Sequence, residues 1–188
     1  DNNKYYPMKK IRKKFFLIIG RHNPHKNLVR VIKAFAYAKV NDYKLIFVGP
    51  FDKRYTPILL KLIDKYNIRH LCVWKGWIND DEKLSLLNEC QALIIASLWE
   101  GFGLPALEAM ACGTPVIASE RGALREVMGD YGYFVNPFNI QSIASAMHAV
   151  INDKKCFEKA LQEGPLRAGS FNWLDTAKTI EKIIQEIE

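Results

Sequence analysis

Short runs of consecutive apolar residues recur along the whole chain. Runs of this kind are typical of strands that are buried on both faces, as in a parallel sheet covered by helices. Six strands are predicted from them, at Phe15 to Gly20, Lys44 to Gly49, Leu71 to Trp74, Ala92 to Ser97, Pro115 to Ala118 and Tyr133 to Val135.

Between these runs, apolar residues recur every three or four positions, which indicates amphipathic helices. The clearest example runs from Leu28 to Phe35, and we expect Asn23 to cap this helix and Pro24 to occupy its first position. Further helices are predicted near residues 55–66, 80–90, 104–112, 122–128, 139–151, 156–163 and 173–187.

Strands and helices therefore alternate, and connections of this length require the strands to pair in parallel. The pattern predicts a Rossmann-like α/β fold, a doubly wound parallel sheet with helices on both faces. We expect one domain over residues 14–188, preceded by a basic lead-in or linker at 1–13. In such sheets ligands bind beyond the carboxyl ends of the strands, so the residues that follow each strand are the candidates for function.

Composition agrees with a folded domain, because 49% of the 188 residues are apolar and 12% are aromatic. No apolar run approaches the roughly 20 residues that span a bilayer, and no signal peptide opens the chain. We therefore expect a soluble protein. Because the chain begins at Asp1 rather than at a methionine, we expect it to be part of a longer protein.

The cysteines are widely spaced and form no C-x-x-C pair, which favours buried, reduced thiols and a cytoplasmic location. They are Cys72, Cys90, Cys112 and Cys156.

The formal charge of +7 favours an anionic partner, and the excess is concentrated ahead of the first strand. The residues responsible are Lys4, Lys9, Lys10, Arg12, Lys13 and Lys14. We interpret this cluster as a solvated linker. Nucleic acid is not expected as a partner, because no aromatic residues are interleaved as in RNA-binding modules. Weak association with an anionic membrane surface stays open.

The first strand leads into a turn that carries two cations, Arg21 and Lys26, after Gly20. Together with the N-terminus of the next helix they could bind a diphosphate, although solvated cations on an ordinary turn are an equal alternative. His22 and His25 are expected to have surface or capping roles rather than to bind metal.

The fourth strand is followed by the most informative segment of the chain. Gly101 and Gly103 let backbone approach a ligand, and Pro105 marks the first turn of a new helix. Glu108, one turn further, could accept hydrogen bonds from both hydroxyls of a ribose, or could simply complement the helix dipole. Glu100 stands where it could contact sugar hydroxyls.

These motifs resemble the C-terminal domain of the GT-B glycosyltransferases of family 4, and the resemblance extends from Phe15 to about Lys182. It rests on Gly20-Arg21 with Lys26, Lys44 to Gly49, Lys75-Gly76-Trp77-Ile78, the E-x7-E pair Glu100 and Glu108, Glu108 to Ala118, Glu126 to Asp130, and Phe171-Asn172-Trp173.

The resemblance implies retaining transfer of a hexosyl group from a nucleoside-diphosphate sugar, with GDP-mannose favoured over UDP-sugars. Arg21, Lys26 and Glu100 would be catalytic, the two cations by neutralising the leaving diphosphate. The residues implied to bind the donor are Gly20, Lys75, Trp77, Gly101, Phe102, Gly103, Leu104 and Glu108. No cofactor or metal is expected, and Asp80-Asp81-Glu82 after Asn79 is interpreted as the first turn of a helix.

The acceptor, a saccharide or lipid-linked molecule, would be bound by an N-terminal domain of the same protein that is absent from this sequence. We therefore expect this piece to bind the donor but to transfer sugar poorly. The last helix, from Trp173, either packs on that absent domain or closes this one. The location implied is cytoplasmic, with the inner membrane face as an open alternative.

Two rival functions remain. Gly101 to Ala106 also fits the dinucleotide pattern G-x-G-x-x-A, with Glu120 near the spacing of a ribose-binding acid, which would suit an NAD-dependent oxidoreductase. However, three strands come before the strand that leads into this pattern, whereas the dinucleotide pattern normally follows the first strand of its domain. A non-catalytic nucleotide-binding or assembly domain is the second rival.

Overall fold

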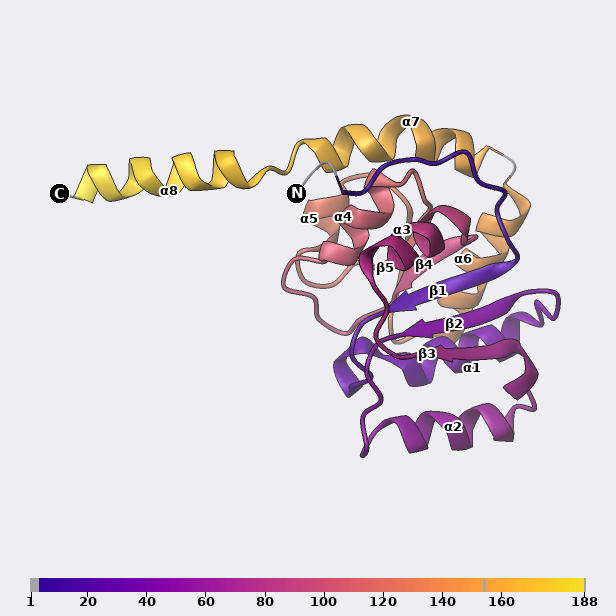
Figure 1. Cartoon of the computed structure of the whole chain (residues 1–188). Helices are drawn as coiled ribbons and strands as arrows, with labels where there is room; N and C mark the ends of the chain where they lie inside the picture. Colours follow the sequence, from indigo (N-terminus) through magenta and orange to yellow (C-terminus); the bar gives the residue numbers. More distant parts are fainter. Residues whose placement is uncertain (1–3, 154, 188) are drawn as a thin grey trace.

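The computed structural model describes residues 4–153 and 155–187, and its centre is a parallel sheet of six strands (Figure 1). The strand order is β3-β2-β1-β4-β5-β6, with parallel pairing throughout. The strands are β1 (Phe15–Ile19), β2 (Lys44–Val48), β3 (Cys72–Lys75), β4 (Ala92–Ile95), β5 (Val116–Ser119) and β6 (Tyr133–Val135). The Rossmann-like fold predicted from the sequence is confirmed, and so is each of the six predicted strands.

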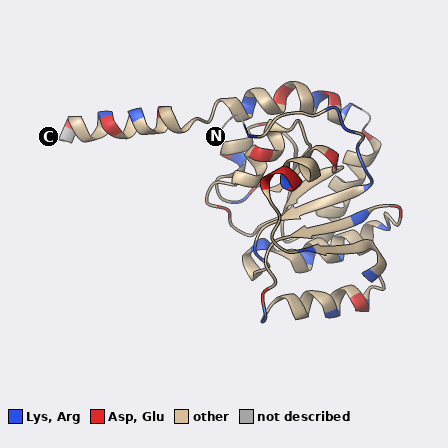
Figure 2. Cartoon of the chain, in the orientation of Figure 1, with Lys and Arg blue, Asp and Glu red and all other residues tan. Residues whose placement is uncertain are grey.

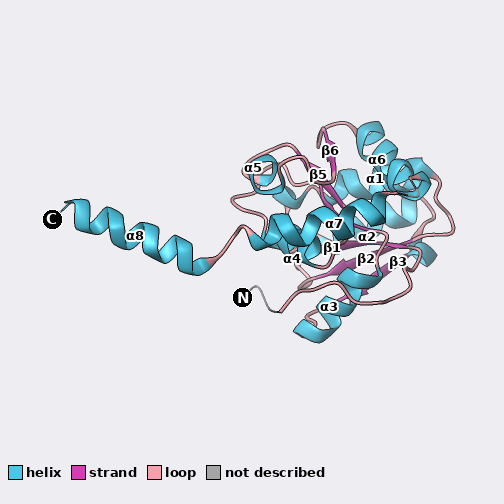
Figure 3. Cartoon of the chain, turned by 90° about the horizontal axis from the view of Figure 1, so that it is seen from above, coloured by secondary structure: helices cyan, strands magenta, loops and turns pink. Residues whose placement is uncertain are grey.

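Helices cover both faces of the sheet (Figures 1 and 3). One face is packed by α1, α2 and α6, and the other by α3, α4, α5 and α7. Their bounds are α1 (Leu28–Ala38), α2 (Thr56–Lys65), α3 (Asp80–Glu89), α4 (Leu104–Ala111), α5 (Leu124–Met128), α6 (Ile140–Asn152), α7 (Cys156–Gly169) and α8 (Trp173–Ile187), with 3₁₀ turns η1 (Pro24–Lys26) and η2 (Arg69–Leu71).

The strands supply both hydrophobic cores through alternate residues. In β1, Phe16 and Ile18 pack against α1 and α6, while Phe15 and Leu17 pack on the side of α3 and α4. Successive side chains of a strand point to opposite faces, so a run that is apolar on consecutive positions is needed to fill both layers.

The beginning of the first long helix differs from the prediction. Pro24–Lys26 form a 3₁₀ turn, Asn23 makes no side-chain capping bond, and α1 begins at Leu28. The break occurs at Asn27, whose left-handed backbone (φ 58°) cannot continue a helix. As a result Lys26 lies on a separate turn ahead of α1 rather than within it.

The seventh helix is longer than predicted, because it continues through Gly164 and Pro165 to Gly169. These two residues are ordinarily helix-breaking signals. Here the helix packs closely on α4, and a Cβ atom at position 164 would lie 2.5 Å from the backbone oxygen of Met110. Tertiary packing therefore overrides the local preference of the sequence.

The four cysteines are free thiols, as predicted. Cys90, Cys112 and Cys156 are buried, whereas Cys72 is half-buried. Burial raises the pKa of Cys90 and of Cys112 to about 12, which makes both unreactive at neutral pH.

The prediction that the lead-in is a solvated linker is wrong at Arg12, whose side chain is part-buried against the domain. The Arg12 guanidinium donates to the backbone oxygens of Leu87 (3.1 Å), Cys90 (3.2 Å) and Gly113 (2.8 Å), and to Oγ1 of Thr114 (2.9 Å). Three of these acceptors are carbonyls at or just beyond the C-terminal ends of α3 and α4, where unpaired oxygens and the helix dipole favour a cation.

Several lysines of the lead-in are neutralised by acidic residues of the domain. They form the pairs Lys4–Asp80, Lys10–Glu89, Lys13–Glu89 and Lys14–Asp42. The remaining Lys and Arg residues are spread over helices on both faces of the sheet (Figure 2). Three carboxylates, Asp42, Asp80 and Glu89, thus offset part of the charge of the basic cluster seen in the sequence.

The last helix, α8, extends away from the rest of the domain (Figures 1 and 3). Its residues Leu174, Ile180, Ile183 and Ile184 are all at least half exposed. The alternative that this helix closes the domain is therefore wrong. Within residues 4–153 and 155–187, no helix has the length and apolar character needed to cross a membrane.

We predict that Arg12→Met lowers the free energy of unfolding by at least about 3 kcal/mol, because it removes four bonds from a charged donor and leaves carbonyls unpaired. Urea denaturation measures the change, and Lys9→Met, at an exposed position, is the control. Equal stability of the two variants would contradict the importance of Arg12.

Candidate functional site

The candidate site lies where the sheet changes winding direction, between β1 and β4. The chain leaves β1 toward β2 on one side, and β4 continues toward β5 on the other. The loops that follow these two central strands therefore diverge and leave a crevice at their carboxyl ends, the usual ligand position in such folds.

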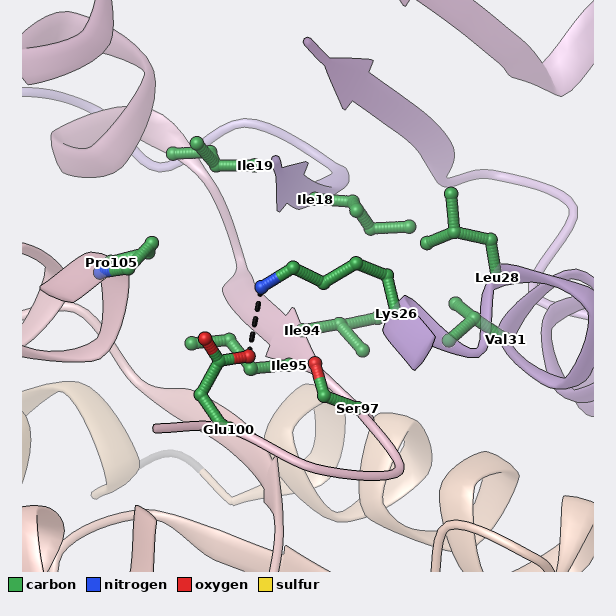
Figure 4. A pocket seen from close by; sticks show the side chains of 10 residues that line it. All are labelled: Ile18, Ile19, Lys26, Leu28, Val31, Ile94, Ile95, Ser97, Glu100 and Pro105. Atoms are coloured by element: carbon green, nitrogen blue, oxygen red, sulfur yellow. Dashed lines mark hydrogen bonds and ion pairs between the residues drawn. The ribbon is translucent and has the colours of Figure 1, made fainter. Parts of the chain in front are cut away.

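Lys26 and Glu100 meet in this crevice (Figure 4). Lys26 Nζ lies 2.8 Å from Glu100 Oε2, and the two side chains are only 19% and 15% exposed. Lys26 comes from the turn after β1, and Glu100 comes from the loop after β4. The structure thus brings together two residues, 74 positions apart, that were predicted to act on one donor.

The position of Lys26 depends on its neighbour Asn27. The buried Asn27 amide donates to the backbone oxygens of Ala96 (2.9 Å) and Pro137 (2.7 Å), and accepts from Arg30 (3.0 Å). These bonds fasten the turn after β1 to the end of β4 and to the loop after β6.

Glu100 is held by the loop that follows β5. Its backbone oxygen accepts from the N–H of Ala123 at 3.0 Å. Gly122 has a left-handed backbone (φ 66°), and a Cβ atom there would lie 2.2 Å from the same oxygen. Only glycine permits this approach. A further bond, from Leu98 N to His25 O (2.7 Å), joins the two site loops directly.

The N-terminus of α4 contributes the third wall. Pro105, in its first turn, lines the small cavity that also contains Lys26, Glu100 and Ser97 (Figure 4). Within the part of the chain that the structure describes, the buried Ser97 hydroxyl oxygen has no hydrogen-bond partner. The cavity thus combines a cation and a helix N-terminus, which suit an anionic group, with a carboxylate and a hydroxyl, which can accept hydrogen bonds from ligand hydroxyls.

Glu108 lies one turn into α4 and pairs with Lys83 of α3, with Nζ 2.5 Å from Oε2. Glu108 also lines a groove of about 800 Å³, together with Phe102 and Leu104. Phe102 packs edge-on against Phe171 at a centroid distance of 5.8 Å. The side chains of Phe102 and Leu104 therefore face the groove, while Gly101 is exposed and Gly103 precedes the first turn of α4.

The remaining predicted residues are not among those that line this cavity. Gly20 lies under the Lys26 side chain, since a Cβ atom there would be 3.4 Å from Lys26 Cε. Arg21 is exposed and forms no ion pair within the described residues. Lys75 pairs with Glu82, and Trp77 is 85% exposed. Trp77 is not among the residues that line the cavity.

His22 is 2% exposed, so the expectation of a surface or capping role is wrong. Its Nδ1 lies 3.1 Å from Thr56 Oγ1, and its ring stands edge-on to Trp74 at 5.0 Å. Burial lowers the pKa of His22 below its ordinary value of 6.5, and the nearby Asp52 offsets only part of this effect. His22 is therefore a neutral support beneath the turn that carries Arg21 and Lys26.

The predicted helix start at Asp80 is confirmed, because Asn79 accepts from the backbone N–H of Glu82 at 2.8 Å. In the part of the chain that the structure describes, no three His, Cys, Asp or Glu side chains gather as metal ligands. The sequence analysis missed Asn27, Gly122 and Lys83. A glycine in the loop after a strand was a usable signal for Gly122, which lies three residues beyond the end of β5, but the other two act through distant partners.

Comparisons with known proteins identify the family of this chain. The profile of the family described as "Glycosyl transferases group 1" matches residues 7–165. The serotype-specific mannosyltransferase WbdA of Escherichia coli is 28% identical over 87% of this chain, which covers 20% of that protein. Other relatives, 29 to 33% identical, are also named mannosyltransferases. The chain spans less than half the length of each of these relatives.

Solved structures share the fold. The C-terminal domain of the group 1 glycosyl transferase LpcC from Francisella tularensis is 28% identical, with a TM-score of 0.78, over 90% of this chain and 96% of that one. Anabaena HepE, solved with UDP and glucose, is 21% identical, with a TM-score of 0.88, over 99% of this chain and 55% of that one. At that identity the second similarity shows the fold alone.

We predict that the protein loses stability as the pH falls below 6.5, more steeply than the variant His22→Asn does. The unfolded chain takes up a proton on His22 first, because the pKa of this group is lowered only in the folded state. The stabilisation is complete above pH 6.5 and is lost as the pH falls through the lowered value. Chemical denaturation at pH 7.5 and pH 5 measures it, with His148→Asn, at an exposed site, as control. Parallel curves for wild type and His22→Asn would refute it.

Proposed function

Because this chain belongs to the family of group 1 glycosyl transferases, we propose that it is the donor-binding domain of a retaining hexosyltransferase. The ligand is a nucleoside-diphosphate sugar, bound at the crevice between β1 and β4. The observation that carries the proposal is the part-buried pair of Lys26 and Glu100, which places a cation and a hydrogen-bond acceptor together at the ligand position of the fold.

In this proposal Lys26 and Arg21 bind the diphosphate. Negative charge grows on the diphosphate as the bond to the sugar breaks, so cations at this point stabilise the transition state more than the bound donor. The N-terminus of α4 adds partial positive charge on the opposite wall. These groups can act without a metal.

The other residues are assigned to the sugar, the ribose and the base of the donor. Glu100 accepts hydrogen bonds from sugar hydroxyls, exchanging part of its contact with Lys26 for them. The backbone of residues 101–104 faces sugar and phosphate oxygens, and Glu108 accepts from the ribose hydroxyls. The base extends toward Lys75 and Trp77 at the end of β3, where an exposed aromatic ring could stack on it.

We propose mannose as the sugar and GDP as the nucleotide. The support for mannose is the names of the relatives, which are mannosyltransferases at 28 to 33% identity. UDP is the alternative, favoured by the ligand of the Anabaena structure.

The acceptor, a saccharide or lipid-linked molecule, is proposed to bind a separate N-terminal domain of a longer protein. The apolar face of α8 supports this arrangement, because the helix leaves the domain with its Leu and Ile side chains uncovered. A lipid-linked acceptor would bring the protein to the inner face of a membrane.

We predict that GDP binds the 188-residue chain, and that Lys26→Met and Arg21→Met each weaken binding by about 10- to 100-fold. Each variant removes a charge-assisted bond to phosphate. Isothermal titration with GDP, UDP and NAD measures the affinities. Lys178→Met, on exposed α8, is the matched control and should bind like wild type.

Each outcome of this titration bears on a different claim. Tighter binding of UDP than of GDP would change the base but keep the site. Binding of NAD alone would support the oxidoreductase alternative, and binding of no nucleotide would support a non-catalytic domain.

We also predict that the 188-residue chain does not turn over GDP-mannose, because the groups that bind the acceptor lie outside it. A coupled assay that measures the release of GDP from GDP-mannose should show only the uncatalysed rate, although the chain binds GDP. Sustained turnover by this chain alone would overturn the proposed division of labour between two domains.

A further inference from the structure

Two residues that were not part of the predicted site contact the carboxylate of Glu108. Lys83, from α3, lies 2.5 Å from Oε2 and is itself only 20% exposed. Tyr5, from the lead-in, lies with its ring beneath the same ammonium, at 5.2 Å from the ring centroid. Tyr5 also lines the groove that contains Glu108. Three segments that are distant in sequence thus meet at one carboxylate.

This arrangement determines what Glu108 can do. A carboxylate that is only 18% exposed is costly to leave unpaired, and the ammonium of Lys83 provides a partner of opposite charge. An ionised carboxylate only accepts hydrogen bonds, which suits it to receive them from two hydroxyls. Because Lys83 occupies one side of Oε2, it also fixes the orientation of the group.

Tyr5 completes the cluster from the other side of Lys83. Burial raises the pKa of Tyr5, and the negative charge of Glu108 raises it further, so the phenol stays neutral. The neutral ring lies under the ammonium as a cation–π contact, and the phenol hydroxyl also interacts with the Glu108 carboxylate. The lead-in is thereby built into the wall of the site.

We propose that Lys83 is a positioning residue for recognition of the nucleotide ribose, acting through Glu108, and that Tyr5 supports it. This inference rests on the proposed function. It makes the lead-in and α3 part of donor recognition, although neither is predicted to touch the diphosphate or the sugar.

The test is the ability of the protein to distinguish ribose from deoxyribose. We would titrate the 188-residue chain with GDP and 2′-deoxy-GDP, and with UDP and 2′-deoxy-UDP. The wild type should prefer each ribonucleotide by roughly tenfold, since the deoxy form lacks a bond to a charged acceptor. Lys83→Met should bind the ribonucleotide roughly tenfold more weakly and lose most of the preference, while the deoxy form changes little.

Two further variants separate positioning from folding. Lys83→Arg retains a cation and should restore most of the preference, whereas a merely structural defect would weaken ribo and deoxy forms alike. Tyr5→Ala removes the ring under the ammonium and should lose part of the preference. Lys159→Met, which breaks the exposed pair with Glu163, is the matched control.

The outcomes are distinguishable. If the wild type binds and prefers the ribonucleotide, but Lys83→Met keeps that preference or binds more tightly, the positioning role is wrong and the proposed function stands. If the wild type binds neither nucleoside diphosphate, the proposed function itself fails and the inference fails with it.

Discussion

The arrangement of this domain depends on the central strand, because β1 pairs in parallel with both β2 and β4. The chain can satisfy both pairings only by winding outward in opposite directions from this strand. The chain therefore turns away in opposite directions after the neighbouring strands β1 and β4, and the loops that follow these two strands leave a crevice between them. Lys26 and Glu100 follow these strands, so strand order determines where their charges meet.

Three pairs of opposite charge lie around the site, namely Lys26 with Glu100, Lys83 with Glu108, and Lys75 with Glu82. Each pair lies in partly buried surroundings, where an isolated charge would be costly. In the proposed function, a diphosphate would take Lys26 in part from Glu100 and would also pair with the exposed Arg21. Such a site remains folded before the ligand arrives and still offers both donors and acceptors to it.

The sequence predicts those features that depend on residues close together in the chain. Buried strands require consecutive apolar residues, and functional residues of this fold follow strands, so the sheet, Lys26 and Glu100 could be located in advance. The residues that the sequence analysis did not identify depend on contacts with residues that are distant in sequence. The side-chain amide of Asn27 donates to the carbonyls of Ala96 and Pro137, and the roles of Arg12 and Lys83 depend on helices far along the chain. His22 looked exposed because its neighbours are polar, but Trp74 and Thr56 cover it.

Arg12 has a mechanical consequence for a protein of more than one domain. By binding the C-terminal ends of both α3 and α4, it fastens the lead-in to the two helices that carry Lys83 and Glu108. A chain segment held in this way cannot serve as a pivot. The described part of the lead-in, residues 4–13, is therefore expected to move together with α3 and α4. A pull on it would reach the carboxylate that is proposed to bind the ribose through these two helices.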